Sequence, residues 1–102
     1  MKQLITLCAG ASLIIAAGVA QARDLGPDEA LRLRDAGTIQ SFEKLNALAT
    51  AKHPGAVIED TELEQTAGRY VYEVELRDPQ DVQWDMKLDA VSGEVLQDQQ
   101  EN

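Results

Sequence analysis

Two stretches in the second half of the chain alternate between apolar and polar residues, as half-buried β-strands do. They are joined at Asp78–Asp81, where an Asp-Pro pair favours a reversal of the chain. The apolar positions are Tyr70, Tyr72, Val74 and Leu76 in the first stretch, and Val82, Trp84, Met86 and Leu88 in the second. Most positions between them are charged. The pattern predicts an antiparallel hairpin over residues 69–90, with one face on a core and the other in water.

The length of the turn decides which side chains of this hairpin face each other. A three-residue loop, Pro79-Gln80-Asp81, ends in a left-handed residue and pairs Leu76 with Trp84 and Val74 with Met86. A four-residue loop mixes the two faces, whereas a register two residues shorter keeps them apart and stays open. On the polar face the three-residue loop sets Glu73 against Lys87, which is favourable, and Glu75 against Asp85, which is unfavourable.

The first half of the chain shows helical spacing instead. Pro27 and the acids after it are typical of a first helical turn capped by Asp24 or Gly26, and Gly37 is a typical helix end. A second helix is expected from Thr38 or Ser41 to Lys52, stopped by His53-Pro54-Gly55. Its apolar stripe, spaced by three and four residues, consists of Ile39, Phe42, Leu45, Leu48 and Ala49.

The remaining segments have weaker patterns. Ala56–Gln65 predicts a first strand with Val57, Thr61 and Leu63 inward, and Ile58 out of phase indicates a bulge or an edge position. Glu94–Leu96 is expected to form a brief last strand. We expect Arg23–Gly26 to be frayed and the polar end, Gln97–Asn102, to be disordered.

We therefore predict an α+β fold: a three-stranded antiparallel β-meander with an amphipathic helix packed on one face. A short N-terminal helix precedes it, and a signal peptide helix precedes both. The expected division of the chain is a signal peptide at 1–22, a short helical segment at 23–37, a folded domain at 38–97 and a disordered tail at 98–102.

The N-terminal segment has the features of a secretory signal. Lys2 is followed by an uncharged, mostly apolar run, and Ala20-Gln21-Ala22 gives the small-x-small cleavage pattern. The apolar run is shorter than the span of about 20 residues that a membrane helix needs. We expect cleavage after Ala22 and a periplasmic or secreted protein. Cys8, the single cysteine, is lost with the signal, and Leu7 before it does not fit lipid attachment.

The chain is acidic, with 18 Asp and Glu against 9 Lys and Arg, and a net charge of −9. Such a charge disfavours nucleic acid and anionic membranes, so we expect no nucleic acid and no membrane partner after cleavage. Cations or basic protein surfaces are better candidate partners. The alternative is that the acids only keep an exported protein soluble. The oligomeric state is not indicated.

Known catalytic and metal-binding patterns are absent from the sequence. There is no phosphate-binding glycine loop, no Ser-x-Gly elbow and no calcium-binding loop. His53, the single histidine, is best explained as a helix C-terminal residue near the helix dipole. Carboxylates on an open strand face lack the pocket that raises a pKa for acid catalysis. We expect no enzyme activity, no cofactor and no metal site, with weak cation binding at Glu75 and Asp85 left open.

Three segments resemble the PepSY domain family: HPGAVIEDTELE from His53, GRYVYEVEL from Gly68 and WDMKLDAVSGEVL from Trp84. The family's Tyr-Glu-Val strand is matched at Tyr72, and its Asp-Ala-x-Ser/Thr-Gly-Glu ending at Asp89. The resemblance covers residues 38–96 and departs at Asp81, where many relatives have a turn glycine. It implies a small α+β domain without catalytic residues, of the kind found in inhibitory peptidase propeptides and as stand-alone exported proteins.

Two hypotheses for the function follow from this resemblance and from the charge. The first is a regulator or inhibitor that binds a periplasmic peptidase or another envelope protein through a strand edge or the acidic face. The alternative is a sensory accessory protein that binds a divalent cation or a signalling-receptor domain. The candidate partner-contact residues are Glu73, Glu75, Asp85 and Lys87.

Overall fold

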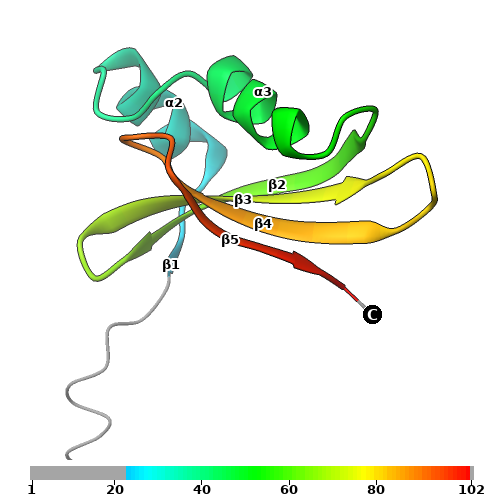
Figure 1. The fold of residues 1–102 in the computed structure, drawn as a ribbon. Helices are drawn as coiled ribbons and strands as arrows, with labels where there is room; N and C mark the ends of the chain where they lie inside the picture. The colour runs from blue at the N-terminus through cyan, green and yellow to red at the C-terminus, as the bar shows by residue number, and fades with distance from the viewer. Residues whose placement is uncertain (1–22, 102) are drawn as a thin grey trace, which may run out of the picture.

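The structure is a computed structural model that describes residues 23–101. Two helices lie on one face of a five-stranded antiparallel sheet whose strand order, β1-β2-β3-β4-β5, follows the chain (Figure 1). We call the face under the helices the inner face and the opposite one the outer face. The elements are β1 Arg23–Asp24, α2 Pro27–Asp35, α3 Phe42–Lys52, β2 Val57–Thr66, β3 Arg69–Arg77, β4 Gln83–Asp89 and β5 Val95–Gln100.

The predicted α+β class is confirmed, but the prediction of three strands was wrong. Arg23–Gly26, expected to be frayed, contributes β1, which pairs Arg23 with Gln65 and Asp24 with Glu64 of β2. The side chain of Leu25, the next residue, is buried in the core. At the other end Gln97–Gln100, expected to be disordered, belongs to β5 and pairs with β4. Backbone hydrogen bonds to a neighbouring strand order both segments without an apolar alternation of their own.

The two helices begin and end close to the expected residues. Gly26 is the N-cap of α2, with Pro27 as its first residue, and Gly37 follows the helix at a φ of 77°. The hydroxyl oxygen of Ser41 accepts a hydrogen bond from the backbone N–H of Lys44, which caps α3. His53 is the C-cap of α3.

The first predicted strand contains a bulge, as its pattern indicated, and β1 pairs only with Glu64 and Gln65 at its far end, so the bulged half lies at an edge of the sheet. Pairing with β3 shifts register between Ile58 and Asp60. The extra residue brings Ile58 onto the core, whereas Val57, expected inward, is 65% exposed. Thr66-Ala67-Gly68 then turns the chain into β3, with positive φ at both Ala67 and Gly68.

The register of the β3–β4 hairpin is the one that a three-residue loop predicts. Leu76 pairs with Trp84, Val74 with Met86 and Tyr72 with Leu88, which excludes the shorter register. Asp81 is left-handed, with a φ of 69°. The core lies between this hairpin and α3, and its largest fully buried side chains are Leu45, Val74, Leu76, Met86 and Leu88.

The predicted signal peptide, residues 1–22, lies outside the described residues. Within residues 23–101, no helix is long and apolar enough to cross a membrane.

Candidate functional site: the acidic outer face of the sheet

The outer face of the sheet carries most of the acidic side chains of the strands, and neither helix covers it (Figure 1). Strand alternation places the polar positions of β3 and β4 on this face, opposite their buried apolar neighbours. All four predicted contact residues lie there, in the expected pairs. Glu73 is opposite Lys87, with 3.4 Å between Oε2 and Nζ, and Glu75 is opposite Asp85. The structure thus confirms the pairing, and their role in contacting a partner stays a prediction.

A row of carboxylates crosses the middle of this face, and we call it the carboxylate row. It consists of Asp60, Glu75 and Asp85, which are paired neighbours on β2, β3 and β4. The nearby cations are engaged elsewhere, because Arg77 pairs with Glu59 and Lys87 with Glu73. The row therefore has no basic partner among residues 23–101, and like charges directly opposite each other destabilise a sheet.

The row borders a shallow hollow of about 250 Å³. Besides the row, its lining includes Glu62 and Glu73, so five carboxylates surround a single cation, Lys87. A hollow of this composition complements a cationic group, such as the guanidinium of an arginine or the ammonium of a lysine.

The last strand adds a further carboxylate to the row. Oxygen atoms of Glu75, Asp85 and Glu101 lie within 4.8 Å of one another. Oδ1 of Asp85 is buried and accepts no hydrogen bond from a described residue. The carboxylate of Asp85 raises the pKa of Glu101 above its ordinary value. These three residues are one of two groups in residues 23–101 that have the donor atoms to hold a metal ion.

The second group lies at the other end of the outer face and consists of Asp24, Glu62 and Glu64. Partial burial, with Glu73 beside it, raises the pKa of Glu64 from 4.5 to about 7. The pKa of Glu62 is also raised, chiefly by the charge of Asp24. Glu64 therefore exchanges a proton near neutral pH. Proton transfer alone does not make an active site, and the single histidine of the chain lies on the helix side of the sheet.

The sequence predicted the β3 and β4 members of this face but not the members from β1, β2 and β5. Asp60, Glu62 and Glu64 recur at every second position of β2, which is a signal that could have placed them on one face. The bulge at Ile58 obscured that phase. Asp24, considered only as a helix cap, and Glu101 gave no signal for this face, because both lie in short segments that were expected to be frayed or disordered.

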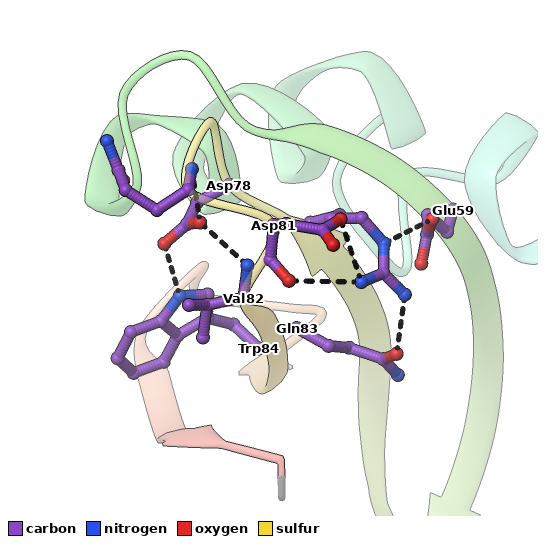
Figure 2. A network of polar contacts seen from close by, with 8 residues as sticks. Glu59, Asp78, Asp81, Val82, Gln83 and Trp84 are labelled. Carbon is purple, nitrogen blue, oxygen red and sulfur yellow. Dashed lines mark hydrogen bonds and ion pairs between the residues drawn. The ribbon is translucent and has the colours of Figure 1, made fainter.

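At the far end of the hairpin, polar contacts fix the turn and one edge of the outer face (Figure 2). The guanidinium of Arg77 donates to Glu59 Oε2 at 3.0 Å and to Gln83 Oε1 at 3.1 Å, and it also reaches the Asp81 carboxylate. Arg77 thereby links β3 to the bulge of β2 and to β4. This cation is occupied by neighbours of its own chain.

Asp78 organises the turn itself. Its Oδ1 accepts hydrogen bonds from the N–H groups of Gln80 and Val82, both at 2.9 Å, and its Oδ2 accepts one from Nε1 of Trp84 at 3.0 Å (Figure 2). The bond from Trp84, with those from the turn, holds the pKa of Asp78 below its ordinary value. This carboxylate is a structural one.

His53 lies at the end of α3, as predicted, but it has a specific partner. Its Nε2 is 2.8 Å from Oδ1 and 3.0 Å from Oδ2 of Asp98 on β5. The imidazole also lies against the Trp84 ring, with 4.4 Å between centroids. The contact joins the helix layer to the last strand.

A larger hollow of about 480 Å³ lies where α2, α3 and β2 meet, and Phe42, Leu63 and Tyr72 contribute to its lining. The hydroxyl of Tyr72 donates to Oδ1 of Asn46 at 2.8 Å, so these two polar groups already satisfy each other. The other polar residues of its lining are Asp24, Thr61 and Glu62, and both of these acids belong to the second carboxylate group described above. The acidic outer face remains the stronger candidate.

The motif at Asp89 also has a structural explanation. Oδ1 of Asp89 accepts hydrogen bonds from the N–H groups of Val91 and Ser92, at 2.8 and 3.0 Å, which lowers the pKa of Asp89. Gly93 has a φ of 85°, and a Cβ there would lie 2.8 Å from a methyl of Leu48 on α3. Asp89 and Gly93 thus close the β4–β5 turn against the helix.

Comparison with known proteins gives a family match and no individual relative. No curated protein matches the chain, and no solved structure does. A scan of protein families matches residues 39–98 to PepSY, described as "Peptidase propeptide and YPEB domain". The matched region runs from the residues before α3 into β5 and includes most of the carboxylate-rich sheet. Because the match spans more than half of the sequence, the chain belongs to the PepSY family.

Proposed function

We propose that this protein is a non-catalytic exported module that binds a basic surface on a periplasmic peptidase or another envelope protein, and so regulates or inhibits it. Membership of PepSY, a family associated with peptidase propeptides and inhibitor-like modules, supports a protein-binding role. The observation that carries the proposal for this chain is the carboxylate row, three like charges on three neighbouring strands without a basic partner among the described residues.

The physical reason is charge complementarity. Repulsion within the row lowers the stability of the free protein, and a lysine or arginine from a partner would relieve it. The hollow beside the row gives such a side chain room to approach several carboxylates at once. Residues on the rim of such a contact set the association rate and its dependence on salt.

The test is capture of partners from a periplasmic extract by the immobilised mature protein. Glu75→Lys and Asp85→Lys each reverse one charge of the row, and each should reduce capture of a basic partner. Asp35→Lys is the matched control, because Asp35 is exposed on α2, away from the outer face, and forms an ion pair with its neighbour Arg34. If all three variants capture the same proteins equally well, the outer face is not the binding surface.

The stability of the variants shows whether a loss of capture comes from a lost binding surface or from misfolding. Glu75→Lys places a lysine opposite Asp85 and should leave the free protein as stable as the native one, or more stable by about 0.2–1 kcal/mol. A variant that gains stability and loses its partner identifies the row as a binding surface. A captured peptidase should also lose activity in proportion to added protein, and unchanged peptidase activity would contradict inhibition.

The alternative, a sensory protein that binds a divalent cation, is tested with the same mature protein. Calorimetric titration with calcium, magnesium and ferrous iron should give no saturable heat at millimolar concentration if the acids serve a protein partner. Saturable heat that disappears in Asp85→Asn would favour the sensory alternative, with Glu75, Asp85 and Glu101 as the ligands.

A further inference from the structure

The two edges of the sheet differ in how well they are protected from pairing with a strand of another chain. At the β2 edge, β1 covers Glu64 and Gln65, and the N–H of Leu25 donates to the carbonyl of Leu63 at 2.8 Å. The bulge between Ile58 and Asp60 interrupts the rest of that edge. Natural proteins use such covers and bulges to prevent pairing with another chain.

The β5 edge has none of these protections along most of its length. The strand runs over Val95–Gln100 and pairs with β4 on one side, and no described strand pairs with the other (Figure 1). It contains no proline and no lysine, and its register shift lies at the start of the strand, next to Val95. A six-residue open edge is long enough to template a further strand.

The hydrogen-bonding phase of β5 shows which backbone groups are free. The N–H of Glu101 donates to the carbonyl of Gln83 at 2.9 Å, so Glu101, Gln99 and Gln97 direct their backbone groups toward β4. The alternate residues, Asp98 and Gln100, direct theirs to the open edge. An added strand would bond to these two residues.

The side chains of β5 anchor the strand on the inner face and carry negative charge on the outer face. On the inner face, the Asp98 carboxylate is held by His53 at the end of α3, which fixes the strand in place. On the outer face, Glu101 lies with Glu75 and Asp85 in one carboxylate group. A side chain opposite Gln99 or Glu101 on an added strand would lie beside this group.

We propose that β5 is the docking edge, and that the partner supplies an extended segment which adds to it as a sixth strand. Lys or Arg residues at alternate positions of this segment would lie on the outer face and reach Glu75, Asp85 and Glu101. The inference rests on the proposed function and adds the form and chemistry of the partner's contact segment. A second copy of the chain fits poorly, because antiparallel β5 strands would bring two acidic faces together, each from a chain of net charge −9.

The probe is a synthetic nine-residue peptide, acetylated and amidated, in which lysine alternates with threonine and valine. Its counterpart carries N-methyl groups on alternate residues, which removes the donors of one edge and leaves the charge unchanged. We expect the unmodified peptide to bind the mature protein at least about tenfold more tightly than the methylated one, given the backbone bonds of an added strand. Equal affinity for both peptides, or none for either, would overturn strand addition.

Hydrogen exchange followed by NMR locates the added strand. Exchange of the Asp98 and Gln100 amide hydrogens should slow when the unmodified peptide binds. The Gln97 and Gln99 amides already face β4 and serve as internal references. Protection that appears along β2 instead, or nowhere, would contradict the assignment to β5.

A pair of variants at one position tests the edge within the protein. Gln100→Pro removes an amide that faces the open edge, so it costs no hydrogen bond to β4 and should leave the fold intact. It should weaken binding of the unmodified peptide by about tenfold or more, whereas Gln100→Ala, which keeps the amide, should stay within about twofold. Circular dichroism confirms that both variants fold.

The outcomes separate this inference from the proposed function. If Gln100→Pro binds the peptide and the captured partner as the native protein does, while Glu75→Lys captures less, strand addition fails and the outer-face proposal stands. If Glu75→Lys and Gln100→Pro are both without effect, both fail. A dimer detected by light scattering that Gln100→Pro dissociates would assign the edge to a second copy and overturn the inference.

Discussion

At the scale of single residues, the five carboxylates with a shifted pKa divide into two groups by their surroundings. Asp78 and Asp89 each accept two backbone N–H bonds within a turn, and the pKa of each is lowered. Glu62, Glu64 and Glu101 lie among other acids, and the pKa of each is raised. The first group stabilises the turns that it closes, and the second lies on the outer face that we propose as the binding surface.

Asp81 is a residue at which the fold accepts strain. Its φ of 69° is left-handed, which costs a non-glycine residue roughly 1–2 kcal/mol, less for aspartate. We expect Asp81→Gly to raise the free energy of unfolding by about 0.5–1 kcal/mol, because the greater freedom of glycine in the unfolded chain offsets part of the relief. Urea unfolding measures the change. Asp81→Ala, which removes the carboxylate and keeps the strain, is the control and should not stabilise.

Trp84 combines several contacts in one side chain. It packs on the core, its ring lies against His53, and its Nε1 donates to Asp78. Because the ring is only half-buried, Trp84→Ala should cost about 3 kcal/mol, near the lower end for large aromatic residues. Urea denaturation measures the loss, with Trp84→Phe as a milder control that keeps an aromatic ring. A cost below about 1 kcal/mol would mean that the ring is not part of the core.

At the scale of elements, the sequence predicted the strands and helices that bury a regular apolar pattern. It did not predict the strand segments that are held only by backbone hydrogen bonds to a neighbour. The register of β3 with β4 followed from alternation and turn length, since a one-residue slip would expose every apolar side chain. The stripe of α3 followed from its spacing in the same way. Arg23–Asp24 and Gln97–Gln100 have no such pattern, because hydrogen bonds to a neighbouring strand hold them. His53 and Asp98 were equally unpredictable, since 45 positions separate them in the chain.

The candidate site shows the same division. Glu73, Glu75, Asp85 and Lys87 were predictable because they alternate with core residues of a well-marked hairpin. Glu101 and Asp24 were not, since their strands became evident only in the folded chain. The residues that carry the resemblance to PepSY include Asp89 and Gly93, which close the β4–β5 turn.

Deletion of residues 97–102 tests whether β5 stabilises the domain. The truncated chain loses the ladder bonds to β4 and the partner of His53, and at about 0.5–1 kcal/mol for each bond it should lose roughly 2 kcal/mol or more. Tryptophan fluorescence should shift to the red, because Trp84 loses its neighbour Gln100. Deletion of Asn102 alone is the control. If the long deletion leaves the urea midpoint unchanged, these residues do not form a strand in solution.

At the scale of the whole molecule, charge and architecture are separated by face. The helices bury the apolar side of the sheet, and the outer face holds two clusters of acids, the carboxylate row with Glu101 and the group of Asp24, Glu62 and Glu64. The like charges of the carboxylate row repel each other in the free protein, and no cation among the described residues neutralises them. We interpret the arrangement as one suited to a basic partner, and its energetic consequence for the free protein is a dependence of stability on pH.

The direction of that dependence follows from the two groups of carboxylates. The pKa of Glu64 rises from 4.5 to about 7 on folding, so its contribution favours the folded state below pH 4.5 and is lost as pH rises through 7. The pKa values of Asp78 and Asp89 fall below 3.8 on folding, so their contribution is present above pH 3.8 and is lost in stronger acid. The melting temperature, followed by circular dichroism, should therefore be highest near pH 4–5 and decline toward pH 7.5.

Glu64→Gln should flatten that decline, whereas Glu43→Gln, on the exposed side of α3, should not. A melting temperature that rises steadily from pH 4.5 to 7.5 would contradict the strained outer face.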